Sequence, residues 1–125
     1  MGKKLIKKRI TEILDGFKGK DIILSLGNAN FFGQQSRKKT QVRGNGLLLL
    51  TAEELFFEMW YPKKQLQIPV SSILKIEIAK SFLHKTAFRK LLKVVYSNQE
   101  GEEDAAAWWV TPLDKWIEEL EKLKS

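Results

Sequence analysis

The sequence predicts a mainly β domain with one helix at each end. Two observations indicate the sheet: short apolar runs and apolar–polar alternation recur between residues 21 and 110, and Gly, Pro, Asn and Ser separate them. A third observation indicates the helices, because apolar residues recur every three or four positions in 3–17 and again in 113–123. The chain of 125 residues with 43% hydrophobic content is long enough for one domain with its own core.

The composition excludes several kinds of chemistry. The chain has no cysteine and one histidine, so disulfides, thiol chemistry and Cys/His zinc sites are excluded. No apolar run approaches the roughly 18 residues that a membrane-spanning helix needs. We therefore expect a soluble, cytoplasmic protein.

The first element is a basic amphipathic helix within residues 1–19. Its apolar stripe consists of Ile6, Ile10, Ile13, Leu14 and Phe17. A stripe of this kind packs on the body of a domain or lies on a membrane surface, and both alternatives stay open at this point.

A short strand follows in residues 21–26, because it is β-branched at two positions and Gly19 and Gly27 bound it. We expect a long polar connection from 28 to 41. Its second half, 34–42, can itself form an irregular strand, which the pattern does not decide.

Residues 44–57 predict a β-hairpin around Thr51 to Glu54. Gly44 and Gly46 fit turn positions that permit positive φ. The leucines at 47–50 point alternately to both faces of a sheet, so this strand needs cover on both sides. The N-terminal helix is the best candidate for the outer cover.

Four further strands and a helix complete the chain. We place the strands near 66–70, 74–79, 88–96 and 105–110. The strand 74–79 has the cleanest alternation, with Leu74, Ile76 and Ile78 on one face. In the helix after Thr111, which fits the N-cap, the apolar stripe is Leu113, Trp116, Ile117, Leu120 and Leu123.

The net charge of +7 is unevenly distributed, and the last quarter of the chain is acidic. The candidate residues for binding an anionic lipid or ligand form two clusters: Lys3, Lys4, Lys7, Lys8 and Arg9 in the first helix, and Arg37, Lys38, Lys39 and Arg43 in the polar connection. Such clusters can meet anionic lipid or nucleic acid, or they can simply keep the protein soluble.

No motif indicates an enzyme. Leu49 stands where a GxGxxG motif needs its third glycine, and His84 has no recognisable catalytic partner in the sequence. The carboxylates show no metal-ligand spacing, so we expect no cofactor and no metal. Trp60, Tyr61, Trp108 and Trp109 could stack on nucleic-acid bases, but no single strand interleaves aromatic residues with Lys and Arg, which argues for core packing and against nucleic acid.

Four segments, in this order, resemble a PH-like domain of the GRAM or bacterial PH type. They are 46–51 (GLLLLT), 54–57 (ELFF), 68–73 (IPVSSI) and 116–120 (WIEEL). The resemblance implies a half-open antiparallel barrel of about seven strands in residues 20–125, capped by a C-terminal helix whose Trp116 plugs one end. The basic helix of residues 1–19 is additional to that domain and is expected to pack on or beside it.

Members of that family bind acidic lipids in some cases and proteins in others. In lipid-binding members the basic site lies between the first two strands, where Arg37, Lys38, Lys39 and Arg43 fall. We therefore expect a non-enzymatic peripheral adaptor that contacts acidic lipid at the inner membrane surface. The alternative is a protein–protein interaction module with no lipid role, and the oligomeric state stays open.

Overall fold

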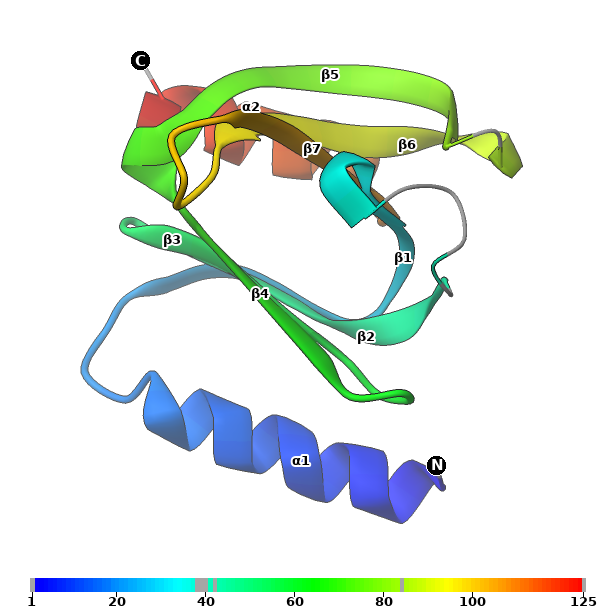
Figure 1. Ribbon diagram of the computed structural model, residues 1–125. Coiled ribbons are helices and arrows are strands. Elements are labelled where there is room, and N and C mark those ends of the chain that lie inside the picture. Colours follow the sequence, from blue (N-terminus) through cyan, green and yellow to red (C-terminus); the bar gives the residue numbers. More distant parts are fainter. Residues whose placement is uncertain (1, 38–40, 42, 84, 125) are drawn as a thin grey trace.

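The computed structural model describes residues 2–37, 41, 43–83 and 85–124. Two α-helices flank seven strands, which form one antiparallel sheet with the order β4-β3-β2-β1-β7-β6-β5. The elements are α1 (Lys3–Gly16), β1 (Ile22–Gln34), η1 (Gln35–Arg37), β2 (Gly44–Thr51), β3 (Glu54–Met59), β4 (Lys64–Pro69), η2 (Val70–Ser72), β5 (Ile73–Phe82), β6 (Lys85–Ser97), β7 (Glu103–Trp109) and α2 (Leu113–Lys124). The sheet bends into a half-barrel, so the predicted mainly β architecture with a helix at each end is confirmed (Figure 1).

The strand β1 joins the two halves of the sheet. Its first part pairs with β2 and its last part with β7, and the pairing with β2 shifts register between Leu26 and Ala29. The prediction that the strand ends at Leu26 and gives way to a long polar connection is therefore wrong. Gly27 and Asn28 mark a bulge that bends the strand, which continues to Gln34.

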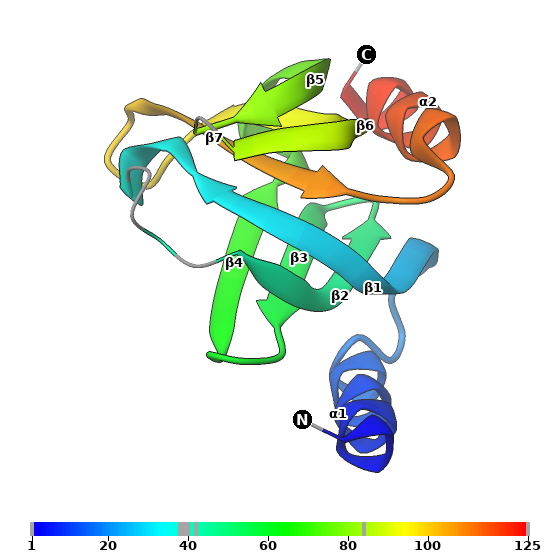
Figure 2. The ribbon, with the colours of Figure 1, turned by 90° about the vertical axis from the view of Figure 1, so that its right-hand side faces the viewer.

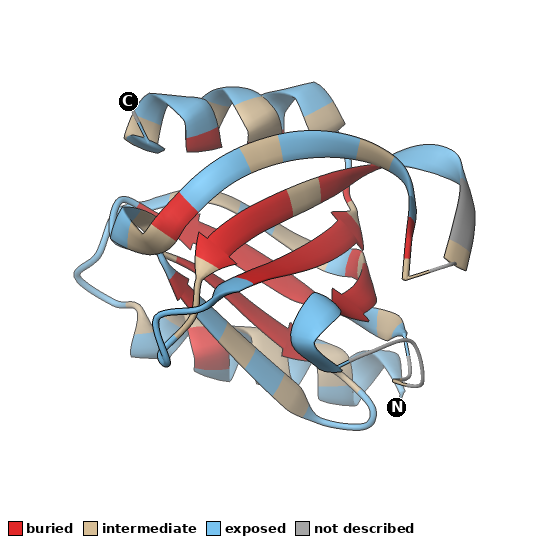
Figure 3. Cartoon of the chain, turned by 45° about the horizontal axis from the view of Figure 1, so that its top comes forward, coloured by how far each residue is buried: buried red, intermediate tan, exposed pale blue. Residues whose placement is uncertain are grey.

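The main core lies between the two halves of the sheet. It gathers large side chains such as Phe31, Phe57 and Trp108, none of which is more than 1% exposed. The helix α2 adds Trp116, which is 1% exposed, and Leu120 to the same core. Figure 3 shows the buried stretches on the strands between the two helices.

The hairpin of β2 and β3 has a core face on each side. Leu48 and Leu50 belong to the main core, whereas Leu47 and Leu49 form an outer cluster with Ile13 of α1. The helix lies along the outside of this hairpin, so it supplies the cover that the leucine run needs (Figure 1).

The glycines at the start of β2 have a different role from the predicted one. Among the described glycines, positive φ occurs at Gly19, Gly33 and Gly101 and not in β2. Gly46 lies against the backbone of β3, and a Cβ there would collide with the carbonyl oxygen of Glu58. The absence of a side chain therefore permits close strand approach instead of a turn.

A partly buried ion pair also joins α1 to the hairpin. The Arg9 guanidinium donates from Nε to Glu58 Oε2 at 2.6 Å and from Nη2 to Oε1 at 2.8 Å, and Glu58 is 2% exposed. Gln65 donates a further bond of 2.7 Å to Glu58 Oε1. The hydrogen bonds from Arg9 lower the pKa of Glu58 although burial opposes this, so the carboxylate stays charged.

The strand β5 departs from the predicted alternation. Burial along it recurs at every third residue, at Ile73, Ile76, Ala79 and Phe82, while Leu74 is 45% and Ile78 is 55% exposed. Register shifts near both ends of the β5–β6 pairing rotate the strand, so its side chains do not keep one strict alternation. Leu74 and Ile78 consequently face solvent along an edge of the sheet.

Candidate functional site

The connection between β1 and β2 is anchored at both of its described parts. In η1, Ser36 donates from its backbone N to Asp104 Oδ1 at 3.0 Å and from Oγ to Oδ2 at 2.6 Å. On the return, the Gln41 side chain accepts from the backbone N of Gln34 at 3.0 Å and donates to its carbonyl oxygen at 2.6 Å. These bonds fix where Arg37 and Arg43 leave the sheet. Lys38 and Lys39 lie outside the described residues.

A buried polar cluster supports that anchor. Gln34 Nε2 donates to Tyr96 Oη at 3.0 Å, and Tyr96 Oη donates to Asp104 Oδ2 at 3.2 Å. Burial raises the pKa of Tyr96 to about 12, so the phenol keeps its proton and remains a donor. Because Asp104 also accepts from the backbone of Ser36 and Ala105, its oxygens are used in holding the fold.

The two arginines of the connection serve different cavities. Arg37 lines a polar cavity of 980 Å³ between β4, η1 and the β6–β7 turn, together with Lys64. Burial, and secondarily the charge of Arg37, lowers the pKa of Lys64, which places the two cations near each other. Arg43 instead lines a separate pocket on the outer face of the sheet. The structure therefore divides the predicted basic loop between two places.

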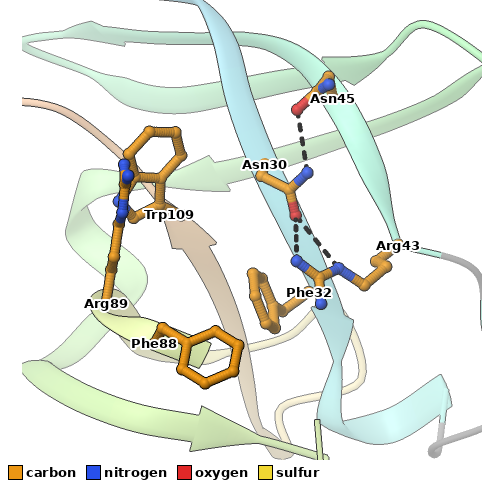
Figure 4. A pocket seen from close by; sticks show the side chains of 7 residues that line it. All are labelled: Asn30, Phe32, Arg43, Asn45, Phe88, Arg89 and Trp109. Atoms are coloured by element: carbon orange, nitrogen blue, oxygen red, sulfur yellow. Dashed lines mark hydrogen bonds between the residues drawn. The ribbon is translucent and has the colours of Figure 1, made fainter. Parts of the chain in front are cut away.

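The outer pocket has a volume of 410 Å³ and draws its walls from four strands and the residue before β2. It is lined by Asn30, Phe32, Arg43, Asn45, Phe88, Arg89 and Trp109 (Figure 4). We call it the Arg43–Arg89 pocket. Two of its residues are cations and three are aromatic, a combination that suits an anion carrying a flat or apolar group.

Each arginine of this pocket lies on an aromatic ring. The guanidinium carbon of Arg43 is 3.8 Å from the centre of the Phe32 ring, and that of Arg89 is 4.7 Å from the Trp109 ring. Arg43 also donates from Nε and Nη2 to Asn30 Oδ1 at 3.3 and 3.1 Å. Asn30 in turn donates to Asn45 Oδ1 at 3.0 Å, so a chain of polar contacts orients Arg43.

A bulge of four residues in β6 forms the opposite wall of the Arg43–Arg89 pocket. Ala79 pairs with Leu91 and Ser81 pairs with Thr86, so residues 87–90 of β6 stand opposite Lys80 alone. Phe88 and Arg89 lie in this bulge, and Phe88 is fully exposed at 105%. Bulges re-aim side chains in this way beside many binding sites.

The tip of the β5–β6 hairpin folds back onto β1. Lys85 Nζ donates to the carbonyl oxygens of Phe32 at 3.1 Å and Gln41 at 3.2 Å. Burial, with a smaller effect from Arg43, lowers the pKa of Lys85. Gly33 leaves room for the contact, because it has φ +124° and a Cβ there would lie 2.9 Å from both Gln41 and Leu83. These contacts fix the tip of the β5–β6 hairpin next to the Arg43–Arg89 pocket.

The predicted cations of α1 behave in two ways. Lys3, Lys4, Lys7 and Lys8 are exposed and line neither cavity. Arg9 is used in the ion pair with Glu58, which leaves it 28% exposed and turned toward β3. The four lysines, and not Arg9, are available on the helix surface.

The sequence-based reasoning missed Phe88, Arg89 and Asn30, and it assigned Trp109 to the core together with Trp108. Trp108 is fully buried, but Trp109 is half-buried and lines the pocket. The one available signal was the basic stretch 85–90 around an apolar residue, which a regular strand pattern hides.

Two classes of site are absent from the part of the chain that the structure describes. No three His, Cys, Asp or Glu side chains gather there to hold a metal ion. None of its helices has the length and apolar character to cross a membrane.

Comparison with known proteins gives a fold and no family. No family model matches the chain, and no curated protein is similar to it in sequence. A solved structure titled "The 8S snRNP Assembly Intermediate" contains a chain with a TM-score of 0.63 at 10% identity, covering 82% of this chain and 81% of that one. The C-terminal domain of an unknown protein from Leishmania infantum also has a TM-score of 0.63, at 13% identity, covering 95% of this chain and 97% of that one. At such identities the likeness concerns the fold alone.

Proposed function

We propose that this chain is a non-enzymatic PH-like binding module, a peripheral adaptor that contacts acidic lipid at the inner membrane surface in the cytoplasm. The observation that supports this proposal is the separation of charge between the two ends of the half-barrel. Proteins use a one-sided positive field to approach anionic surfaces.

The basic end comprises the N-terminal turns of α1, the β1–β2 connection, the β3–β4 turn and the β5–β6 turn. The described residues of these four segments lie on the right-hand side of Figure 1, which is the side that faces the viewer in Figure 2. The described residues within 3–8, 35–43, 60–64 and 80–90 include no aspartate or glutamate, and each of the four segments contributes lysine or arginine among them. A surface built from them is therefore positive.

The opposite end is acidic. The β2–β3 turn carries Glu53 and Glu54, and the β6–β7 turn carries Glu100 and Glu102. Because the charges separate along the barrel, a negatively charged membrane attracts one end and repels the other. This orients the protein with α1 and the β1–β2 connection toward the membrane.

Co-sedimentation with lipid vesicles tests the proposal. We expect binding to vesicles rich in phosphatidylserine and none to phosphatidylcholine vesicles, with weakening as salt is raised. The triple variant Lys3→Gln, Lys4→Gln, Lys7→Gln should partition roughly a hundredfold less, since each cation near the surface contributes on the order of 1 kcal/mol.

A matched control separates position from net charge. The variant Lys115→Gln, Lys122→Gln, Lys124→Gln removes the same charge from α2, which lies on the opposite side of the sheet from α1, and should keep nearly all vesicle binding. Equal losses in the two triple variants, or binding that ignores the lipid charge, would contradict the proposal.

A protein-interaction role is the second candidate, and the edge strand β5 favours it. β5 pairs with β6 alone, and it exposes Leu74 and Ile78 along its free edge. An extended peptide with alternating apolar residues can add to such an edge. A peptide-library screen should then enrich alternating sequences whose binding Ile78→Lys abolishes, and binders indifferent to Ile78→Lys would count against this role.

A further inference from the structure

The sequence argues against nucleic acid because no single strand interleaves aromatic residues with cations, but the fold interleaves them in space. In the Arg43–Arg89 pocket, Phe32 comes from β1, Phe88 from β6 and Trp109 from β7, with a guanidinium on two of these rings. The elements of a base-stacking site with phosphate ligands are thus assembled from separate strands.

We propose that the Arg43–Arg89 pocket binds one nucleotide of a single-stranded nucleic acid, with the base against Phe88 and the phosphates on its two sides on Arg43 and Arg89. The proposal concerns a ligand class different from the lipid of the preceding subsection and does not rest on membrane association.

The aromatic rings hold both guanidinium groups in place for a phosphate. A cation–π contact does not use the N–H donors of a guanidinium, which therefore remain available to bind oxygen. Arg43 gives two of its donors to Asn30, and no other described residue accepts from it. The side chain is therefore oriented and still has donors for a ligand.

Phe88 supplies the stacking surface. Its ring is fully exposed, so it contributes nothing to the core, and the bulge of residues 87–90 holds it beside the pocket. In Figure 4 the Phe88 ring lies below both pairs, with Arg89 and Trp109 to its upper left and Phe32 and Arg43 to its upper right. A base laid on Phe88 would have a guanidinium on either side for its phosphates.

The polar wall suits the edge of a base. Asn45 is exposed and uses its Oδ1 to accept from Asn30, which leaves its Nδ2 as a donor at the rim. An asparagine amide pairs with base edges, and no such group is needed for a simple anion.

Several features favour a nucleotide over a lipid head group at this pocket. A phospholipid carries no flat ring, so it would leave the Phe88 face without a stacking partner. The surrounding basic end can instead follow the neighbouring phosphates of a strand.

Fluorescence anisotropy with labelled oligouridine and oligoadenosine of about ten nucleotides tests the proposal on the full chain. Phe88→Ala should weaken binding about tenfold to a hundredfold, the range for loss of one stacked base, and Phe88→Trp should restore it. Because Phe88 has no packing contacts to lose, thermal unfolding should not change. Leu74→Ala, which truncates another side chain that is 45% exposed but lies outside the pocket and the basic end, should leave affinity unchanged.

Binding affinity and its salt dependence test the roles of the two arginines. Arg89→Lys keeps the charge but loses the planar fork, so we expect roughly tenfold weaker binding. Arg43→Gln should in addition reduce the slope of log affinity against log salt by about 0.7, the value for one phosphate of a single strand.

Each other outcome overturns the proposal. It fails if neither oligonucleotide binds at low salt, or if Phe88→Ala binds them as tightly as Leu74→Ala does. It fails equally if Phe88→Ala loses binding to phosphatidylserine vesicles but keeps oligonucleotide binding, because the pocket would then serve the membrane. Loss of oligonucleotide binding with vesicle binding intact supports this site and leaves the lipid role standing separately.

Discussion

The two helices carry similar apolar stripes, yet they belong to different layers of the molecule. α2 buries Trp116 and Leu120 in the main core between the two halves of the sheet. α1 buries only Ile13, against the outside of the β2–β3 hairpin. Their charges are opposite as well, since α1 is basic and α2 is acidic.

The difference shows that an amphipathic stripe predicts that a helix packs on the domain, but it does not predict which surface of the sheet the helix covers. α2 shares the main core with residues from both halves of the sheet, so it should unfold only with the whole domain. α1 is held by one small cluster and one ion pair, so it should be able to detach while the barrel stays folded. Four predictions test this contrast.

The largest effect should follow removal of the α2 anchor. Trp116→Ala empties a site that is 1% exposed in the main core, and such truncations cost about 3–5 kcal/mol. Urea unfolding followed by circular dichroism should show one cooperative transition at a much lower midpoint. A small shift would place α2 outside the cooperative unit and contradict the comparison.

A smaller, local effect should follow truncation of the α1 anchor. Ile13→Ala opens the outer cluster with Leu47 and Leu49 at a cost of about 2–3 kcal/mol. We expect faster tryptic cleavage after Lys18 and Lys20, which link α1 to β1, with little change in amide exchange protection of β6 and β7. Protection that falls throughout the sheet would show that α1 is part of the main unit.

The ion pair gives a pH-dependent effect. Arg9→Met leaves the buried Glu58 carboxylate without its cation and should cost about 2 kcal/mol at neutral pH. Since the folded pKa of Glu58 lies below its ordinary 4.5, the contribution of the pair is complete above that value and is lost as pH falls through the folded pKa. Urea unfolding of both proteins across this range should show the difference shrinking toward low pH, and a constant difference would exclude the linkage.

The smallest effect should come from the outer face of α1. Lys8→Gln changes an exposed residue that contacts neither the outer cluster nor Glu58, so stability should change by less than about 0.5 kcal/mol. Comparing the thermal unfolding of Lys8→Gln with that of Ile13→Ala tests which face of α1 packs on the hairpin. A loss comparable to that of Ile13→Ala would mean that α1 packs through another face.

Local rules account for most of the fold. The leucines at 47–50 and their need for cover on both faces predict the hairpin, its two cores and the position of α1, because a strand exposes alternate residues to opposite faces. The stripe around Trp116 predicts α2 in the same way. These inferences succeed because each depends on a periodicity that lies within one segment.

The candidate site depends on bulges, strand order and register shifts, which leave no periodic pattern in the sequence. Gly27 and Asn28 read as a turn but form a bulge, because pairing of β1 with β2 and then with β7 keeps the strand extended. Arg43 and Arg89 are far apart in the sequence. They line the same pocket only because β2, β1, β7 and β6 are neighbours in the sheet. The rotation of β5 likewise arises from register shifts, which side-chain alternation does not encode.

In the bulge at residues 87–90, the side chains that line the pocket lie outside the part of β6 that pairs with β5. The β5–β6 ladder closes again on both sides of it, at Ala79 with Leu91 and at Ser81 with Thr86. Substitutions within the bulge therefore leave the pairing intact, so this segment can diverge between proteins with the same scaffold and change what they recognise. The same property makes it a natural position for grafting a new recognition sequence onto an unchanged domain.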